Sequence, residues 1–275
     1  MTSQYWDAGQ AHAYHEFQYH FPEKALAGKT VIVTGGSGGL GAATVALLAR
    51  EGAHLVVGYR ANRERAEAMR HAIESSFGGT LMLVAGDIAS AEVRRTYLTA
   101  AQKTGAPLVG VAIFPGDPAR VPFENLNSET LLASLESNYV GPILLAKEIG
   151  SAMESTAVGG SVVLLATMQA LAVFPSSLNY AAPKAALVHA GRILAQRWNH
   201  ARVNVVAPGA TTVGMATASV QSGKYDGHVA SGAVSRFGRP EDVARAVRFF
   251  LEPDNYITGQ IIAVDGGLTL RRDRA

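Results

Sequence analysis

Residues 30–51 read TVIVTGGSGGLGAATVALLARE, and this stretch decides the fold class. Its first five residues form a short β-branched run, which predicts a buried strand. Residues 40–51 place apolar side chains at helical spacing, and Gly52 is expected to end that helix. A glycine cluster lies between the two segments, so the stretch predicts a strand, a tight loop and a helix in immediate succession.

The glycine loop precedes the expected helix, whose N-terminal N–H groups and partial positive charge favour a pyrophosphate. Gly35, Gly39 and Gly41 have the spacing G-x-x-x-G-x-G, and glycine lets the backbone approach phosphates closely. A tight strand-to-helix connection is the alternative, but the context favours a dinucleotide site. The predicted cofactor-binding residues of this loop are Gly35, Ser37, Gly38, Gly39, Leu40 and Gly41.

The second expected strand, 54–59, runs into the arginine-rich sequence GYRANRER. Tyr59 stands where an acidic residue would bind the ribose 2′-hydroxyl of NAD, and Arg60, with Arg63 nearby, suits the 2′-phosphate of NADP. Alternatively, these arginines simply begin a solvated helix. We expect NADP(H) as the cofactor, with use of NAD(H) left open.

Strands and helices continue to alternate along the chain. Further strands are expected at 81–87, 108–114, 161–167, 202–208 and 260–267. Further helices are expected at 63–75, 128–155, from about 180 to 200, and 241–251. The alternation predicts an α/β, Rossmann-like, doubly wound fold with a seven-stranded, mostly parallel sheet and helices on both faces. Asp87, at the end of the third strand, is placed to meet the adenine or to cap a helix.

Composition excludes several classes of function. The 24 basic and 22 acidic side chains give a net charge of +2, which argues against nucleic acid or a membrane as partner. The chain contains no cysteine, so it has no disulfide, thiolate metal site or cysteine nucleophile. No apolar run reaches the roughly 20 residues of a membrane helix, and we expect a cytoplasmic protein. Histidines 12, 15 and 20 fit no metal site, so no metal is expected.

Residues 179–187, NYAAPKAAL, place Tyr180 and Lys184 one turn apart on a single helix face. A free phenol has a pKa near ~10, and a neighbouring ammonium is expected to lower it. Tyr180 could then exchange a proton with a carbonyl or alcohol oxygen. An ordinary amphipathic helix is the alternative, and Pro183 is a candidate site for a kink between the two residues.

Four motifs in this order resemble the short-chain dehydrogenase/reductase family. They are T-G-x-x-x-G-x-G at 34–41, Y-x-x-x-K at 180–184, VNVVAPG at 203–209, and RFGRPEDVARAVRFFLEPDNYITGQIIAVDGG at 236–267. The resemblance implies one Rossmann-like domain over about 27–270, preceded by an arm at 1–26. It also implies a nicotinamide cofactor, a small carbonyl or alcohol substrate, and a homodimer or homotetramer.

The same resemblance assigns catalytic roles. Tyr180 would be the acid/base, and Lys184 would tune it and bind the nicotinamide ribose. Thr167, thirteen residues before Tyr180, matches the active-site serine, and Asn138 matches the helix asparagine whose carbonyl holds a relay water. The remaining predicted cofactor contacts are Ile88, Phe114, Pro115, Gly116, Pro208, Gly209 and Thr211, together with Tyr180 and Lys184.

Two segments depart from the family. Residues 113–116 read Ile-Phe-Pro-Gly where the family has N-N-A-G, so this strand end is expected to pack apolarly. Val213 replaces a threonine, and Thr211 or Thr212 would serve the carboxamide instead.

The Gly/Ser-rich segment 211–235 has the character of a substrate lid. Met215, Val220 and Tyr225 within it, with Phe174, suggest a partly apolar pocket.

The expected function is therefore an NADP(H)-dependent oxidoreductase that transfers a hydride between nicotinamide and a ketone or secondary alcohol. A cofactor-binding regulatory or scaffold protein without turnover is one alternative. An epimerase or dehydratase that uses the same cofactor without net redox change is another.

Overall fold

The computed structural model describes residues 23–156, 158–214, 217–223 and 225–271. The strands are β1 (Thr30–Thr34), β2 (His54–Tyr59), β3 (Leu81–Ala85), β4 (Leu108–Ile113), β5 (Gly160–Leu165), β6 (Ala201–Pro208) and β7 (Ile261–Val264). They form one sheet in the order β3-β2-β1-β4-β5-β6-β7, in which every neighbouring pair is parallel. The predicted Rossmann-like fold is confirmed, with a sheet that is wholly parallel.

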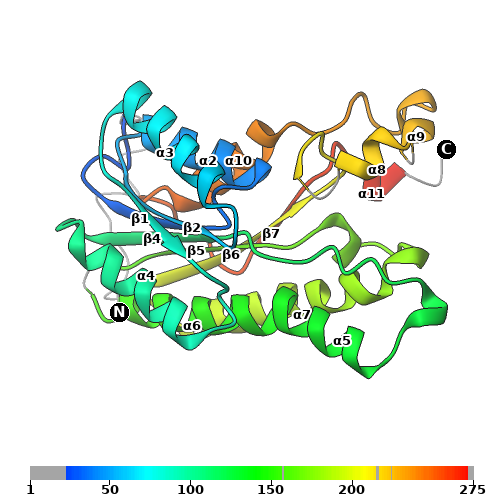
Figure 1. The fold of residues 1–275 in the computed structure, drawn as a ribbon, viewed down its shortest axis with the longest axis horizontal. Coiled ribbons are helices and arrows are strands. Elements are labelled where there is room, and N and C mark those ends of the chain that lie inside the picture. Colours follow the sequence, from blue (N-terminus) through cyan, green and yellow to red (C-terminus); the bar gives the residue numbers. More distant parts are fainter. Residues whose placement is uncertain (1–22, 157, 215–216, 224, 272–275) are drawn as a thin grey trace, which may run out of the picture.

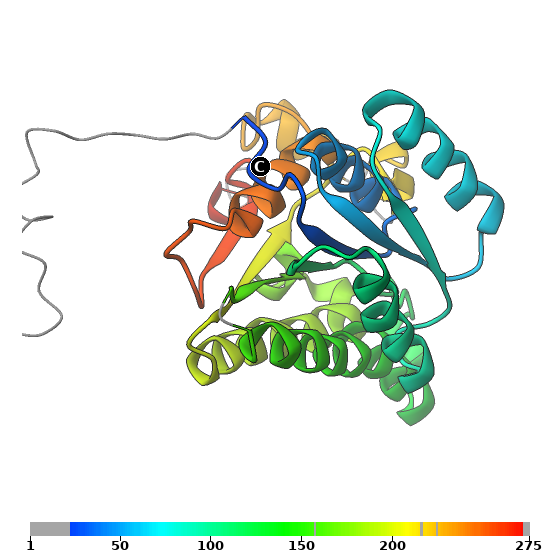
Figure 2. The ribbon, with the colours of Figure 1, turned by 90° about the vertical axis from the view of Figure 1, so that its left-hand side faces the viewer.

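Helices cover both faces of this sheet (Figure 1). The helices are α2 (Gly39–Arg50), α3 (Arg63–Phe77), α4 (Ala91–Lys103), α5 (Ser128–Leu135), α6 (Gly141–Glu154), α7 (Leu178–Arg197), α8 (Thr217–Gln221), α9 (Asp226–Ala230), α10 (Pro240–Leu251) and α11 (Leu268–Arg271). Figure 2 shows α2, α3 and α10 on one side of the sheet and α4, α6 and α7 on the other. α4 is not among the helices expected above, whereas α8 and α9 fall within the expected lid.

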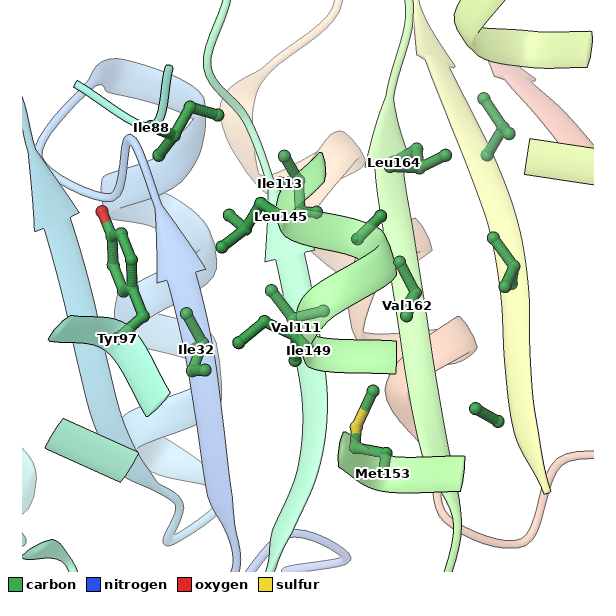
Figure 3. Close-up of a cluster of buried hydrophobic side chains, with 14 of the residues drawn as sticks. Ile32, Ile88, Tyr97, Val111, Ile113, Leu145, Ile149, Met153, Val162 and Leu164 are labelled. Atoms are coloured by element: carbon green, nitrogen blue, oxygen red, sulfur yellow. The ribbon is translucent and has the colours of Figure 1, made fainter. Parts of the chain in front are cut away.

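Strand residues alternate between two hydrophobic cores, because successive side chains point to opposite faces. Ile32 packs with the residues of α4, α6 and α7, while its neighbours Val31 and Val33 pack with those of α2, α3 and α10. Figure 3 shows the first core, where Leu145 and Ile149 of α6 lie against Val111 and Val162 of the central strands. Burial on both faces fixes the sheet and therefore the positions of its strand ends.

The helix predicted over 128–155 is interrupted. A π-helical turn, Glu136–Val140, separates α5 from α6. Pro142 follows this turn and has no N–H to donate to the carbonyl of Asn138, four residues earlier. Single π turns of this kind are frequent at functional sites, and this one contains Asn138.

The N-terminal arm expected at 1–26, including its histidines, lies outside the described residues as far as residue 22. No helix in the described part of the chain is both long and apolar enough to cross a membrane.

Candidate active site

A cavity of about 420 Å³ lies beyond the carboxyl ends of β1, β4, β5 and β6. This edge is where open parallel sheets bind their ligands. The cavity is lined by Leu40, Phe114, Pro118, Ala119, Arg120, Val121, Pro122, Leu165, Ala166, Thr167, Met168, Gln169, Ser176, Ser177, Asn179, Tyr180, Lys184, Pro208, Gly209, Ala210, Thr211, Val213 and Tyr225.

The glycine loop joins β1 to α2 at one side of the cavity. Gly35 has a φ of 66°, a left-handed conformation that favours glycine. A side chain at Gly41 would approach the Gly35 carbonyl oxygen to 2.4 Å, so only glycine permits this packing. The N-cap residue, Gly38, makes no side-chain cap, and the first turn of α2 contains no acidic residue. The N-terminus of α2 therefore fits an anionic pyrophosphate.

The end of β2 lies beside this loop, because the Gly36 N–H donates to the Gly58 carbonyl at 2.9 Å. Tyr59 is half-buried, and Arg60 is exposed in the short turn before α3. Arg63 is also exposed and pairs with Glu67 at 3.8 Å. This region has Tyr59 and Arg60, and no carboxylate, at the predicted ribose position, and the choice of NADP over NAD stays a prediction.

Asp87 and Ile88 follow β3. Asp87 is exposed, and its Oδ1 accepts a hydrogen bond from the Ala89 N–H at 2.9 Å, which forms a turn before α4. Ile88 is 4% exposed and its side chain lies in the hydrophobic core (Figure 3), so this side chain is turned away from any cofactor. Tyr59, Arg60, Asp87 and Ile88 do not line the cavity and stay predictions for the adenosine end.

Thr167 and Tyr180 lie together on the cavity wall. β5 ends at Leu165, so Thr167 lies two residues beyond the strand, where it caps a 3₁₀ turn by accepting from the Gln169 N–H at 3.3 Å. The Thr167 side chain lies close to the Tyr180 hydroxyl and acts against the rise in its pKa. A substrate oxygen placed between the two hydroxyls could be held by one and protonated by the other.

Lys184 is 2% exposed, and its Nζ donates to the Leu165 carbonyl at 2.9 Å and the Pro115 carbonyl at 3.4 Å. These carbonyls belong to the ends of β5 and β4, so the ammonium spans two strands. Burial lowers the pKa of Lys184 to about 7. Gly116 explains how the lysine fits: a Cβ there would lie 3.2 Å from Nζ and 2.7 Å from Asn138 Oδ1.

The expectation that Lys184 lowers the pKa of Tyr180 is wrong for the chain by itself. Burial raises the pKa of Tyr180 to about 12, and the hydrogen bond with Thr167 offsets this only in part. Lys184 does not offset this desolvation, because its Nζ donates to the backbone carbonyls of Leu165 and Pro115. Tyr180 is therefore a neutral phenol near pH 7, the form that donates a proton.

Asn138 is fully buried and ties the loop after β4 to the π-helical turn. Its Oδ1 accepts from the Asp117 N–H at 3.2 Å, and its Nδ2 donates to the Asp117 carbonyl at 3.0 Å and Ser134 Oγ at 3.2 Å. The side chain is thus structural, while the backbone carbonyl lacks its α-helical donor because residue 142 is proline. The relay role that the family resemblance gives to this carbonyl stays a prediction.

Pro183 lies inside α7 without ending the helix, which continues from Leu178 to Arg197. The missing N–H of Pro183 leaves the carbonyl of Asn179 without its helical donor. Ser134 Oγ donates a hydrogen bond to that carbonyl from α5. A neighbouring helix therefore replaces the bond that the proline removes, and Tyr180 and Lys184 stay on one continuous helix.

The end of β4, where the sequence departs from the family, lies beside a buried hydroxyl of β1. Ile113 is buried, and Thr34 Oγ1 at the end of the adjacent strand β1 has no hydrogen-bond partner among the described residues. The predicted apolar packing of this strand end is present, at the cost of one orphaned hydroxyl.

The described residues of the expected lid segment 211–235 pack against the domain. Tyr225 and Val234 are buried with Met168 and Leu268 in a separate small core. Tyr225 lines the cavity, whereas Phe174 and Val220 pack against this small core instead. Met215 lies outside the described residues. Val213 closes over the glycine loop, since a Cβ on Gly39 would meet it at 2.8 Å.

The sequence motifs do not include the residues at the mouth of the cavity. Arg120, Gln169 and Asn179 line it, and Ala119 has a φ of 45°, the one positive value among the non-glycine residues that the structure describes. The proline-flanked segment DPARVP at 117–122 was the available signal, because two prolines after a strand end predict a fixed loop.

These features define the class of protein: a Rossmann-like α/β fold with a cavity across the carboxyl ends of its strands. A family model described as enoyl-(acyl carrier protein) reductase matches residues 35–269. An uncharacterised oxidoreductase of Methylorubrum extorquens is 32% identical over 248 residues, which cover 88% of this chain and 98% of that protein. Carbonyl reductase family member 4 of Danio rerio is 32% identical over 247 residues, with 88% and 98% coverage.

Among solved structures, a short-chain type dehydrogenase/reductase from Mycobacterium ulcerans superposes with a TM-score of 0.83 at 26% identity, over 90% of this chain and 91% of that one. The chain belongs to the short-chain dehydrogenase/reductase family of oxidoreductases.

Proposed function

We propose that this protein is an NADP(H)-dependent reductase of ketones, or dehydrogenase of secondary alcohols, in which Tyr180 is the acid/base. The observation that carries the proposal is that Thr167, Tyr180 and Lys184 line one cavity together with Leu40, which follows the glycine loop. A nicotinamide nucleotide bound there supplies or accepts the hydride. The printed name of the Danio rerio relative, a carbonyl reductase, supports the same reaction class.

The chain's own residues handle the substrate oxygen and its proton. Thr167 donates a hydrogen bond that orients the carbonyl, and the neutral Tyr180 phenol gives its proton to that oxygen as it gains charge. Lys184 lines the same cavity, and in its protonated form it would stabilise the phenolate that remains. The Asn138 carbonyl would hold the water that returns a proton to this pair.

NADP(H) is favoured because Arg60 stands beside the glycine loop with no carboxylate at the ribose position. The lid at 211–235 would close over the bound substrate. We also propose that the protein acts as a homodimer or homotetramer in the cytoplasm, which rests on the family resemblance and on the absence of cysteine.

Turnover with a panel of ketones tests this function. Oxidation of NADPH is followed with the wild type and with Tyr180→Phe, which should lower kcat by at least about 100-fold while NADPH still binds. Tyr256→Phe, at a fully exposed phenol, is the matched control and should behave as wild type. The panel includes an enone, because the matching family model is described as an enoyl reductase.

Equal turnover by Tyr180→Phe and wild type would reject the acid/base assignment.

Cofactor choice is read from the dissociation constants of NADPH and NADH. Arg60→Ala should weaken NADPH by about 10-fold or more and leave NADH nearly unchanged. An equal effect on both cofactors would contradict the NADP assignment but not the enzyme class.

A further inference from the structure

Arg120 is the charged side chain at the substrate end of the cavity, and nothing in the reaction described above uses it. The described residues that line the cavity include two basic side chains, Arg120 and Lys184, and no aspartate or glutamate. Lys184 is buried at the catalytic wall, while Arg120 is exposed in the loop after β4. Arg120 is therefore an exposed basic side chain in the cavity lining, and the described lining residues contribute no carboxylate.

The backbone that carries Arg120 is held in one conformation. Ala119, the preceding residue, has a φ of 45°, which is unfavourable for a residue with a Cβ. The turn persists because the Ala119 N–H donates to Asp117 Oδ1 at 2.7 Å and its carbonyl accepts from Asn179 Nδ2 at 3.2 Å. Asp117 is in turn bonded to Asn138. The loop is thus anchored to the helix turn of Asn138 and to the residue next to Tyr180.

Arg120 also lies close to the lid. Burial raises the pKa of Tyr225, and a hydrogen bond with Gln169 and the charge of Arg120 act in the opposite direction. Gln169 is further hydrogen-bonded to Ser177. The outer end of the cavity is therefore polar and positively charged, in contrast to its apolar walls of Pro118, Val121 and other aliphatic residues.

Resting on the proposed function, we propose that Arg120 determines substrate specificity by binding a carboxylate, so that the substrates are oxo acids and their hydroxy-acid counterparts. A guanidinium presents a planar pair of N–H donors that matches a carboxylate bidentately. The carboxylate would lie at the mouth, with the carbonyl carbon deeper, between Thr167 and Tyr180. The anchored turn at Ala119 fixes the distance between the two ends of the substrate.

Binding decides this proposal independently of turnover. The probes are unbranched oxo acids with the ketone at successive carbons, each paired with its neutral methyl ester. Titration calorimetry with the protein saturated with NADP⁺ measures both members of each pair without reducing them. At least one acid is expected to bind at least about 10-fold more tightly than its ester. The ratio of the dissociation constant of the ester to that of the acid should fall to near one in Arg120→Gln. It should be largely kept in Arg120→Lys.

Arg95→Gln, which removes an exposed arginine on α4 away from the cavity, is the control for net charge and should keep the wild-type ratio. Three outcomes would each overturn the proposal. The wild type could bind every acid and its ester equally, it could bind neither member of any pair, or its preference for the acid could be unchanged in Arg120→Gln. NADPH oxidation with the same compounds then tests the chemistry. Arg120-dependent binding without turnover would reject the proposed function and support the role of Arg120. Turnover without a preference for the acid would support the proposed function and reject the role of Arg120.

Discussion

At the residue scale, Thr34 shows what the altered end of β4 costs. Its hydroxyl is fully buried and has no partner in the described part of the chain. The neighbouring strand end offers Ile113 and Phe114, which provide no polar side chain. An orphaned buried hydroxyl destabilises the folded state, because it loses water without gaining a hydrogen bond.

Replacement of Thr34 by valine should therefore raise the free energy of unfolding, by about 1 kcal/mol. Valine has nearly the same shape and no hydroxyl to desolvate. Thr44→Val is the matched control: Thr44 is equally buried, but its Oγ1 donates to the Leu40 carbonyl at 3.0 Å, so its loss should destabilise. Urea unfolding of both variants measures the difference, and equal destabilisation by the two would show that Thr34 has a partner after all.

At the scale of elements, α5 and α7 are joined by a hydrogen bond that a proline makes necessary. Pro183 cannot donate to the Asn179 carbonyl, and Ser134 Oγ of α5 donates instead. Ser134 also accepts from Asn138 Nδ2 at 3.2 Å. The serine is thus a positioning residue that links the Asn138 turn to the helix of Tyr180 and Lys184.

A double-mutant cycle tests this link. Ser134→Ala should lower the free energy of unfolding by about 1–3 kcal/mol, because it leaves the buried Asn179 carbonyl unpaired. In a Pro183→Ala background the same change should cost at least about 1 kcal/mol less, since an alanine at this position would restore the helical donor. If the two substitutions change the free energy of unfolding additively, to within about 0.5 kcal/mol, then Ser134 and Pro183 act independently.

At the scale of the whole molecule, burial of Lys184 makes global stability depend on pH. The pKa of Lys184 falls from 10.5 to about 7 on folding, so the unfolded chain binds this proton more strongly. Between these two values the unfolded chain keeps a proton that the folded chain has released. The free energy of unfolding therefore rises with pH in this window, by up to about 1.4 kcal/mol per pH unit. Below pH 7 both states are protonated, and the contribution of Lys184 to the slope disappears.

Lys184→Met should remove this slope. The stability of the wild type relative to the variant is expected to increase between about pH 7 and pH 10, and to be flat below pH 7. Lys103→Met, at an exposed lysine of α4, serves as control and should follow the wild type. A wild-type-minus-variant difference that stays constant across the window would show that Lys184 keeps its ordinary pKa in the folded protein.

Local sequence patterns predicted most of the architecture, because strands and helices are fixed by short-range periodicity. β1 and β2 begin and end at the residues predicted for them, and the glycine loop lies between strand and helix as expected. The broken helix at 136–140 and the extra helix α4 were not predicted. A π turn depends on the packing around it more than on its own residues.

The sequence by itself determined the fold family, the glycine loop and the identities of Thr167, Tyr180 and Lys184, since each is carried by a local motif. Only the tertiary structure decided the electrostatics and the mouth of the cavity. Ser134 meets Asn179 across 45 residues, and Asn179 meets Ala119 across 60. Burial by such distant segments sets the pKa values of Tyr180 and Lys184, and contacts between residues so far apart leave no signature in local spacing.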